Sequence, residues 1–141
     1  MRATPAADRA KTVTALYAAF AQGDLPAVLA TFADDAQVTF AARPVQGVPW
    51  MGAFRGHTEI QRFFETLAKE LDFHALQVVG LVAQGEHVVA RVHVEETVRR
   101  TGRLLVDDHV HWWTLGSDGK VRTMTHFLDT QQAAEASVRS S

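Results

Sequence analysis

Cysteine is absent from the 141-residue sequence, which excludes disulfide bonds, cysteine-ligated zinc and thiol chemistry. No apolar run approaches the roughly 18 residues that a membrane span needs, and the opening from Met1 to Pro5 lacks the apolar core of a signal peptide. Neither sign of charge dominates, because 14 Lys and Arg stand against 16 Asp and Glu, a formal net charge of −2. We therefore expect a cytoplasmic protein that binds neither nucleic acid nor membrane.

The composition is that of an ordinary globular protein that is rich in histidine. Apolar residues make up 47% of the sequence and charged residues 21%, as in a typical folded domain. The length fits a single domain over residues 1–141 and suffices for a core without disulfide or metal support. Seven histidines make imidazole chemistry the first functional question.

Apolar residues at helical spacing predict three helices in the N-terminal half. Thr4-Pro5 predicts the start of the first helix and Gly23 its end. Asp24 predicts the cap of a shorter second helix. The third helix opens at Gly56 and has the clearest apolar stripe. The stripe consists of Ile60, Phe63, Phe64, Leu67 and Leu71.

Alternating residues predict one strand before the third helix, at 36–41, and four after it, at about 73–83, 87–99, 103–115 and 120–128. Glycine-containing turns join the last strands. The expected fold is therefore α+β, in the order α-α-β-α-β-β-β-β, with three N-terminal helices packed on a curved antiparallel sheet.

Two segments lie outside this pattern. The loop at 43–55 is rich in Pro and Gly and carries Trp50 and Phe54, so we expect it to gate the mouth of a pocket. The tail at 129–139 is weakly helical, and we expect it at the periphery.

Several short segments resemble the SnoaL-like branch of the nuclear transport factor 2-like superfamily, which includes the ketosteroid isomerases. They are YAAFAQGD at 17–24, FADDA at 32–36, FRGH at 54–57, DGKV at 118–121 and HFLDT at 126–130. The resemblance implies a cone-shaped domain with an apolar pocket between helices and sheet, commonly as a dimer. It leaves the activity open, since this fold hosts isomerases, polyketide cyclases, dehydratases, epoxide hydrolases and proteins without catalysis.

Strand alternation decides which side chains face that pocket. If Leu115 and Lys120 flank the last turn, opposed residue numbers sum to 235. This register pairs Trp113 with Arg122, His111 with Met124 and His109 with His126. One face then carries Asp107, His109, His111, Trp113, Met124, His126 and Leu128.

The preceding strand has a valine-rich face and a polar face. Glu96 lies on the face of Val92, Val94 and Val98, where a carboxylate is costly unless it is paired or protonated. The expected catalytic residues are therefore Glu96, His109, His111 and His126. The expected substrate-binding residues are Tyr17, Phe40, Trp50, Phe54, Trp113 and Met124.

The resemblance also shows where this chain departs from its relatives. His111 matches a pocket carboxylic acid of the ketosteroid isomerases, and Phe40 matches their proton-abstracting aspartate. His126 matches a catalytic carboxylate of the epoxide hydrolases and polyketide cyclases. These replacements argue against steroid isomerisation by that machinery and leave histidine chemistry, which is similar to that of the scytalone dehydratases.

Our first hypothesis is an isomerase, dehydratase or cyclase acting on a small hydrophobic or aromatic ligand without a cofactor. His126 would be the general base, Glu96 its orienting carboxylate, and His111 the donor to an enolate oxygen. A non-catalytic domain that binds a small hydrophobic ligand is the alternative. A third reading is a metal site of His109, His111 and His126, although no metal is our first expectation.

The remaining histidines and the outer sheet face complete the predictions. His57 is expected in a helix-start role, and His74, His87 and His93 are expected to be solvated. The apolar side chains Val110, Trp112 and Phe127 share the outer face of the sheet, which favours a homodimer through that face.

Overall fold

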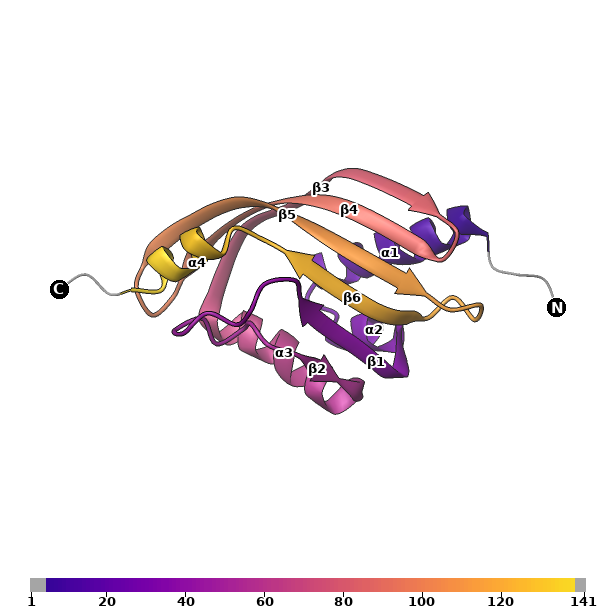
Figure 1. Ribbon diagram of the computed structural model, residues 1–141, viewed down its shortest axis with the longest axis horizontal. Coiled ribbons are helices and arrows are strands. Elements are labelled where there is room, and N and C mark those ends of the chain that lie inside the picture. Colours follow the sequence, from indigo (N-terminus) through magenta and orange to yellow (C-terminus); the bar gives the residue numbers. More distant parts are fainter. Residues whose placement is uncertain (1–4, 139–141) are drawn as a thin grey trace.

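A curved six-stranded sheet organises the fold, and three helices lie on one side of it (Figure 1). The computed structural model describes residues 5–138. The helices are α1 (Ala6–Ala21), α2 (Leu25–Ala30), α3 (Gly56–Glu70) and α4 (Thr130–Ala136). The strands are β1 (Phe32–Phe40), β2 (Phe54–Arg55), β3 (Leu71–Gln84), β4 (His87–Val98), β5 (Arg103–Leu115) and β6 (Val121–Phe127). None of the helices within 5–138 is long and apolar enough to cross a membrane.

The sheet confirms the expected α+β class and corrects one pairing. Its strand order is β2-β1-β6-β5-β4-β3, and every neighbouring pair is antiparallel except β1 and β6. Those two run parallel, with Val38 opposite Met124 and Phe40 opposite His126. Parallel neighbours need a long connection, and the whole chain between the two strands supplies it. The expected all-antiparallel sheet is therefore a mixed sheet.

The N-terminal helices follow the capping signals. Pro5 is the N-cap of α1, whereas Thr4 lies outside the described residues. Gly23 has a positive φ of 71°, a conformation that glycine adopts without a steric penalty, and it ends α1. The Asp24 carboxylate then accepts a hydrogen bond from the Ala27 amide at 3.2 Å and caps α2.

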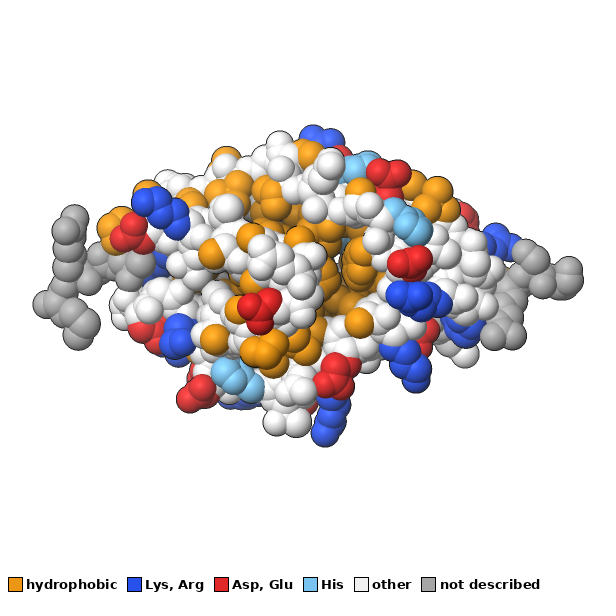
Figure 2. All heavy atoms as spheres, turned by 180° about the vertical axis from the view of Figure 1, so that it is seen from behind, with side chains coloured by type: hydrophobic (Ala, Val, Ile, Leu, Met, Phe, Trp, Pro, Cys, Tyr) orange, Lys and Arg blue, Asp and Glu red, His pale blue; other side chains and the backbone are white. Residues whose placement is uncertain are grey.

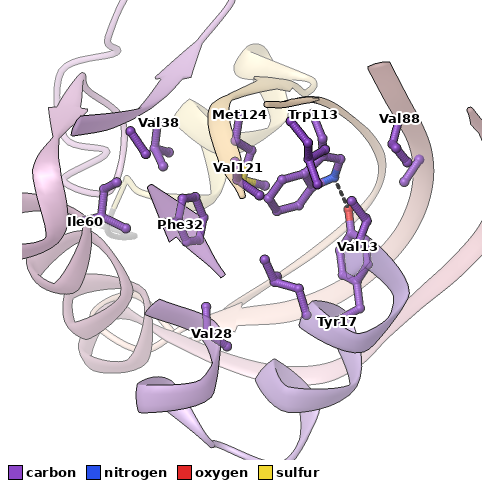
Figure 3. Close-up of a cluster of buried hydrophobic side chains, with 14 of the residues drawn as sticks. Val13, Tyr17, Val28, Phe32, Val38, Ile60, Val88, Trp113, Val121 and Met124 are labelled. Carbon is purple, nitrogen blue, oxygen red and sulfur yellow. Dashed lines mark hydrogen bonds between the residues drawn. The ribbon is translucent and has the colours of Figure 1, made fainter. Parts of the chain in front are cut away.

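The main core lies between these helices and the sheet (Figure 3). Trp113, Phe32 and Phe63 are its largest fully buried side chains, contributed by β5, β1 and α3. Figure 3 shows side chains from α1, α2, α3 and the sheet converging around Phe32 and Trp113. Ile60, Phe63 and Phe64 of the predicted stripe therefore face the core. Leu71, which was predicted in the same helix, instead begins β3 and packs in a second cluster.

The register between β5 and β6 differs from the expected one by two residues. His111 lies opposite His126, and Trp113 lies opposite Met124, so opposed numbers sum to 237 rather than 235. The turn is one residue longer than expected, because Leu115 pairs with Val121. An irregularity then leaves Arg122 unpaired in the ladder and adds the second shift. The two shifts of one residue add up to two, so the same side chains of β5 and β6 point inward as predicted. The predicted cross-strand pairs are wrong.

The loop at 43–55 and the C-terminal helix form a second buried cluster. Trp50 is only 3% exposed and packs with Met51, Leu71 and Leu105. Ala133 and Ala136 of α4 belong to the same cluster. The tail is thus part of a core and not peripheral, because α4 covers apolar residues that the sheet would otherwise expose. The loop itself includes β2, a short strand that pairs with β1.

Arg9 joins α1 to two turns of the sheet and is almost fully buried. Its guanidinium donates hydrogen bonds to the Gly85 carbonyl at 2.9 Å and to the Gly116 carbonyl at 3.2 Å. Gly85 lies between β3 and β4, and Gly116 lies between β5 and β6. One side chain therefore fixes two hairpins, which are distant in sequence, against the first helix.

Replacing Arg9 by methionine should lower the free energy of unfolding by about 2–3 kcal/mol, because charge-assisted hydrogen bonds to two carbonyls are lost. Urea denaturation monitored by circular dichroism measures this change. Lys11→Met, at an exposed position on the same helix, should change the free energy by less than about 0.5 kcal/mol. Equal effects of the two substitutions would contradict the proposed link.

Candidate active site

A cavity of about 70 Å³ lies between α1, α3 and the inner face of the sheet, and we call it the chamber. Its wall includes all four expected catalytic residues: Glu96, His109, His111 and His126. It also includes five of the six expected substrate-binding residues: Tyr17, Phe40, Trp50, Trp113 and Met124. Phe54 is the exception, because its ring packs on Phe63 at a centroid distance of 5.0 Å and is not part of the wall.

Much of the remaining wall consists of residues that the sequence indicated only as core. Phe63, Phe64 and Leu67 come from the apolar stripe of α3, and Phe20 comes from the last turn of α1. In the sequence, these four residues are marked only by their helical spacing. Periodicity identifies a buried face, but it cannot tell a close-packed position from one that borders a cavity.

Tyr17 connects α1 to two side chains of β5. The indole Nε1–H of Trp113 donates to the Tyr17 hydroxyl at 3.0 Å (Figure 3). The same hydroxyl lies 2.6 Å from Nδ1 of His111. Because an indole can only donate, the hydroxyl hydrogen is free for Nδ1, and we assign the His111 proton to Nε2 from this network. Burial raises the pKa of Tyr17 above its usual range, so the hydroxyl keeps its proton.

His126 lies between aromatic rings at the centre of the site. Its imidazole stacks on Phe40 at 4.5 Å and meets the rings of Phe63 at 5.6 Å and His111 at 4.6 Å. Its Nδ1 is buried and has no hydrogen-bond partner. Such an atom carries a desolvation cost that a ligand group can relieve.

Burial keeps both of these histidines neutral. It lowers the pKa of His126 to about 3. Repulsion from His109 acts in the same direction, and the Thr39 backbone opposes both. Burial also lowers the pKa of His111 well below the usual value, with His126 and His109 adding to the effect. At neutral pH the site therefore presents uncharged imidazoles, which can donate and accept hydrogen bonds.

His109 has a carboxylate neighbour that sequence reasoning did not assign to the site. Its Nε2 lies 3.4 Å from Oδ2 of Asp107, but the two are not aligned for a hydrogen bond. Burial lowers the pKa of His109, and the attraction of Asp107 opposes this. Asp107 also accepts a hydrogen bond from the Asp129 amide at 2.9 Å, at the start of α4. The sequence did indicate that Asp107 shares the inward face of β5 with His109, because the two residues are two positions apart.

Glu96 occupies another part of the chamber wall and does not orient His126. The ladder places Glu96 six residues along β4 from Ala90, the residue opposite His111, which is about 20 Å of strand. Among residues 5–138, no hydrogen bond joins Glu96 to His126, so the expected orienting role is not supported. Glu96 is 3% exposed, and burial, assisted by Asp107, raises its pKa to about 7.

The three-imidazole metal site also lacks support. Within the described part of the chain, no three His, Cys, Asp or Glu side chains are arranged to hold a metal ion. His111 already uses its Nδ1 with Tyr17, which removes one ring nitrogen from any shared ligand set.

The other four histidines lie outside the chamber, as predicted. His57, at the start of α3, donates from Nε2 to the Phe32 carbonyl at 2.8 Å. His74 and His87 are exposed and contact threonine hydroxyls. His93 lies on the outer face of β4 and donates to Asp108 at 2.8 Å, which raises the His93 pKa.

Comparisons with known proteins identify the family and agree with the fold. The model of the SnoaL-like domain family matches residues 13–124. An NTF2-like protein from Burkholderia xenovorans has a similar structure, with 25% identity, a TM-score of 0.84, and coverage of 95% of this chain and 98% of that one. No curated protein matches the chain.

Two further solved structures are similar in fold. TerC, co-crystallised with polyporic acid, is 26% identical, with a TM-score of 0.81 and coverage of 92% of this chain and 98% of TerC. A candidate polyketide cyclase from Xanthomonas campestris is 19% identical, with a TM-score of 0.74 and coverage of 94% and 98%.

The depressed pKa of His126 predicts a specific sensitivity to acid. Between pH 6.5 and 3 the unfolded state binds a proton at this residue and the folded state does not, so stability falls as the pH falls. His126→Leu should reduce the loss of unfolding free energy between pH 6 and pH 4 by about 2–3 kcal/mol. Urea denaturation at both pH values measures it.

Met124→Leu is the matched control, since it changes a neighbouring chamber residue without removing a titrating group. It should leave the pH dependence unchanged. A His126→Leu variant with the wild-type pH dependence would show that His126 is not buried as a neutral imidazole.

Proposed function

The chain belongs to the SnoaL-like domain family, and on that premise we propose that it is a small-molecule enzyme of the isomerase, dehydratase or cyclase type. Its substrate would be a small cyclic or aromatic compound that bears a carbonyl or hydroxyl oxygen. The observation that carries the proposal is the buried, unpartnered Nδ1 of His126 beside the Nε2–H that we assign to His111.

His126 would accept the proton that the substrate loses. In the free protein a pKa of about 3 makes it a weak base, because an imidazolium would be poorly solvated in the chamber. A substrate that becomes an enolate as it loses the proton places a negative charge beside the new imidazolium. The attraction of the two charges in a dry site raises the basicity of His126 at the moment of transfer.

His111 would stabilise the oxygen on which that negative charge develops. Its neutral Nε2–H is a donor, and Tyr17 and Trp113 hold the ring in place. Because Trp113 donates to Tyr17 and Tyr17 donates to His111, the hydrogen bonds polarise one another in one direction. A preorganised neutral donor of this kind needs little rearrangement when the charge appears.

Glu96 would supply the second titrating group. With a pKa of about 7 it exchanges between acid and carboxylate near neutral pH, where the chamber histidines stay uncharged. A group of this kind can hold a polar substituent of the ligand at its own end of the chamber, away from His126.

A non-catalytic ligand-binding domain is the second candidate. The weak basicity of His126 in the free protein favours it, and so does the crystallisation of the similar TerC with polyporic acid. In this case the same imidazoles would fix the orientation of a ligand without moving its protons.

Deuterium exchange tests catalysis without knowledge of the substrate. In D₂O the protein should accelerate exchange at the carbon next to the carbonyl of a small cyclic ketone such as 2-tetralone, followed by proton NMR. His126→Gln should lower the rate by roughly 10²–10⁴-fold, as expected for loss of a general base. Thr123→Val, on β6 but outside the chamber wall, should keep most of the rate. Binding without exchange would favour the second candidate, and full exchange by His126→Gln would refute the assigned base.

We also propose that the protein is a homodimer through the outer face of the sheet. Trp112 is 43% exposed and Phe127 is 42% exposed there, with Leu104 and Val106 further along β5. Apolar side chains of this size on one face are typical of a contact surface.

Phe127→Glu should therefore convert a dimer into a monomer of 15.5 kDa, because two carboxylates would be buried at the contact. Sedimentation velocity at micromolar concentration measures the mass. Ala7→Glu adds the same charge on α1, away from this face, and should leave the dimer intact. A monomeric wild-type protein would contradict the proposal.

A further inference from the structure

A second and larger cavity opens beside the chamber, and we call it the outer groove. Its volume is about 490 Å³. It lies among the end of α1, helices α2 and α3, and strand β3, and many of the side chains that line it are small. These are Ala21, Gly23, Ala68 and Ala75. Figure 2 shows that hydrophobic side chains surround a hollow near the middle of the face opposite to that of Figure 1.

The outer groove and the chamber share part of their walls. Phe20, Phe64, Phe73 and Leu76 line both of them. The Phe20 ring contacts Phe64 at a centroid distance of 5.8 Å and Phe73 at 5.6 Å. The three rings therefore form an aromatic partition between two adjoining apolar spaces.

Neither space combines the volume and the polar groups of a complete site. Ligand pockets commonly measure roughly 300–1,000 Å³, and the chamber, at about 70 Å³, is far below this range. The chamber holds the polar groups that the chemistry needs. The outer groove offers room, but Glu65 and His74 are the two titratable side chains in its lining.

Phe20 is the member of the partition that comes from the end of a helix and borders open volume. It is half-buried, on the last turn of α1, and the empty volume of the outer groove adjoins its ring. Phe64, by contrast, is 8% exposed and is held in the core by Phe32 and Phe63. Rotation of one side chain would join the two spaces without a movement of the backbone.

We propose that the outer groove binds an apolar extension of the substrate, an alkyl chain or a second ring, while an oxygenated ring occupies the chamber. Phe20 turns aside to let the ligand span both spaces. The inference rests on the proposed function, since it places the reacting ring beside His111 and His126. It adds the substrate class, which is a ring with a long uncharged substituent.

The test compares two neutral probes, 4-methylphenol and 4-heptylphenol, whose binding is measured by calorimetry. Wild-type protein should bind the heptyl compound at least about tenfold more tightly, because its additional methylene groups leave water. Ala68→Phe fills the outer groove from an exposed position of α3 and should abolish most of this preference. Binding of 4-methylphenol should not change.

Lys69→Phe is the matched control. It adds the same ring at the next exposed residue, which does not line the outer groove, and should keep the wild-type preference. Phe20→Ala removes the ring of the partition and should speed association of 4-heptylphenol in stopped-flow fluorescence, with Trp50 and Trp113 of the chamber as reporters.

The results of the phenol-binding experiment distinguish failure of this inference from failure of the proposed function. If 4-methylphenol binds and Ala68→Phe leaves the preference for the heptyl compound intact, the extension does not lie in the outer groove and the inference is wrong. If the wild-type protein binds neither phenol, the chamber is not a site for an oxygenated ring, and the proposed function and the inference fail together.

Discussion

The hydroxyl group of Tyr17 is the contact on which the site depends. It accepts a hydrogen bond from Trp113, the largest fully buried side chain, and lies 2.6 Å from His111. The hydroxyl satisfies the indole N–H of Trp113 and Nδ1 of His111 in an apolar interior. It also attaches α1 to β5 and fixes the tautomer of His111. A buried network of this kind is favourable only when it is fully satisfied, so the position of the first helix and the chemistry of the chamber are fixed together.

Burial then decides the charge of every titratable group in the chamber. It removes charge from the imidazoles by lowering the pKa of each, and from Glu96 by raising its pKa. The consequences for stability are opposed. As the pH falls from 6.5 toward 3, His126 takes up a proton in the unfolded state only, and the folded state loses stability. Glu96 keeps its proton to a higher pH in the folded state, so its contribution to stability is complete below pH 4.5 and is lost as the pH rises to about 7. The apolar enclosure therefore limits the stability of the protein toward acid through His126 and toward neutral pH through Glu96.

The inward face of the sheet was predictable, but its details were not. Side-chain direction in a strand has a period of two, so His109, His111 and Trp113 must share a face whatever their partners are. The register depends on a longer turn and an irregularity at Arg122, which no alternation pattern records. Glu96 was correctly identified as a carboxylate among valines. Its separation from His126 could not be seen, because it depends on how far along β4 each partner of β5 lies.

Local periodicity and capping residues were sufficient to predict α1, α2 and α3, the strands β1 and β3 to β6, and the inward face of β4, β5 and β6, whereas β2 and the burial of α4 were not predicted. The packing of distant segments was needed to show that Arg9 holds two hairpins, that α4 belongs to a core and that the Asp107 carboxylate lies 3.4 Å from Nε2 of His109. It alone decided that the aromatic partition separates two cavities. These features join residues far apart in the chain, and the volume left between packed side chains is a property of their assembly rather than of any segment.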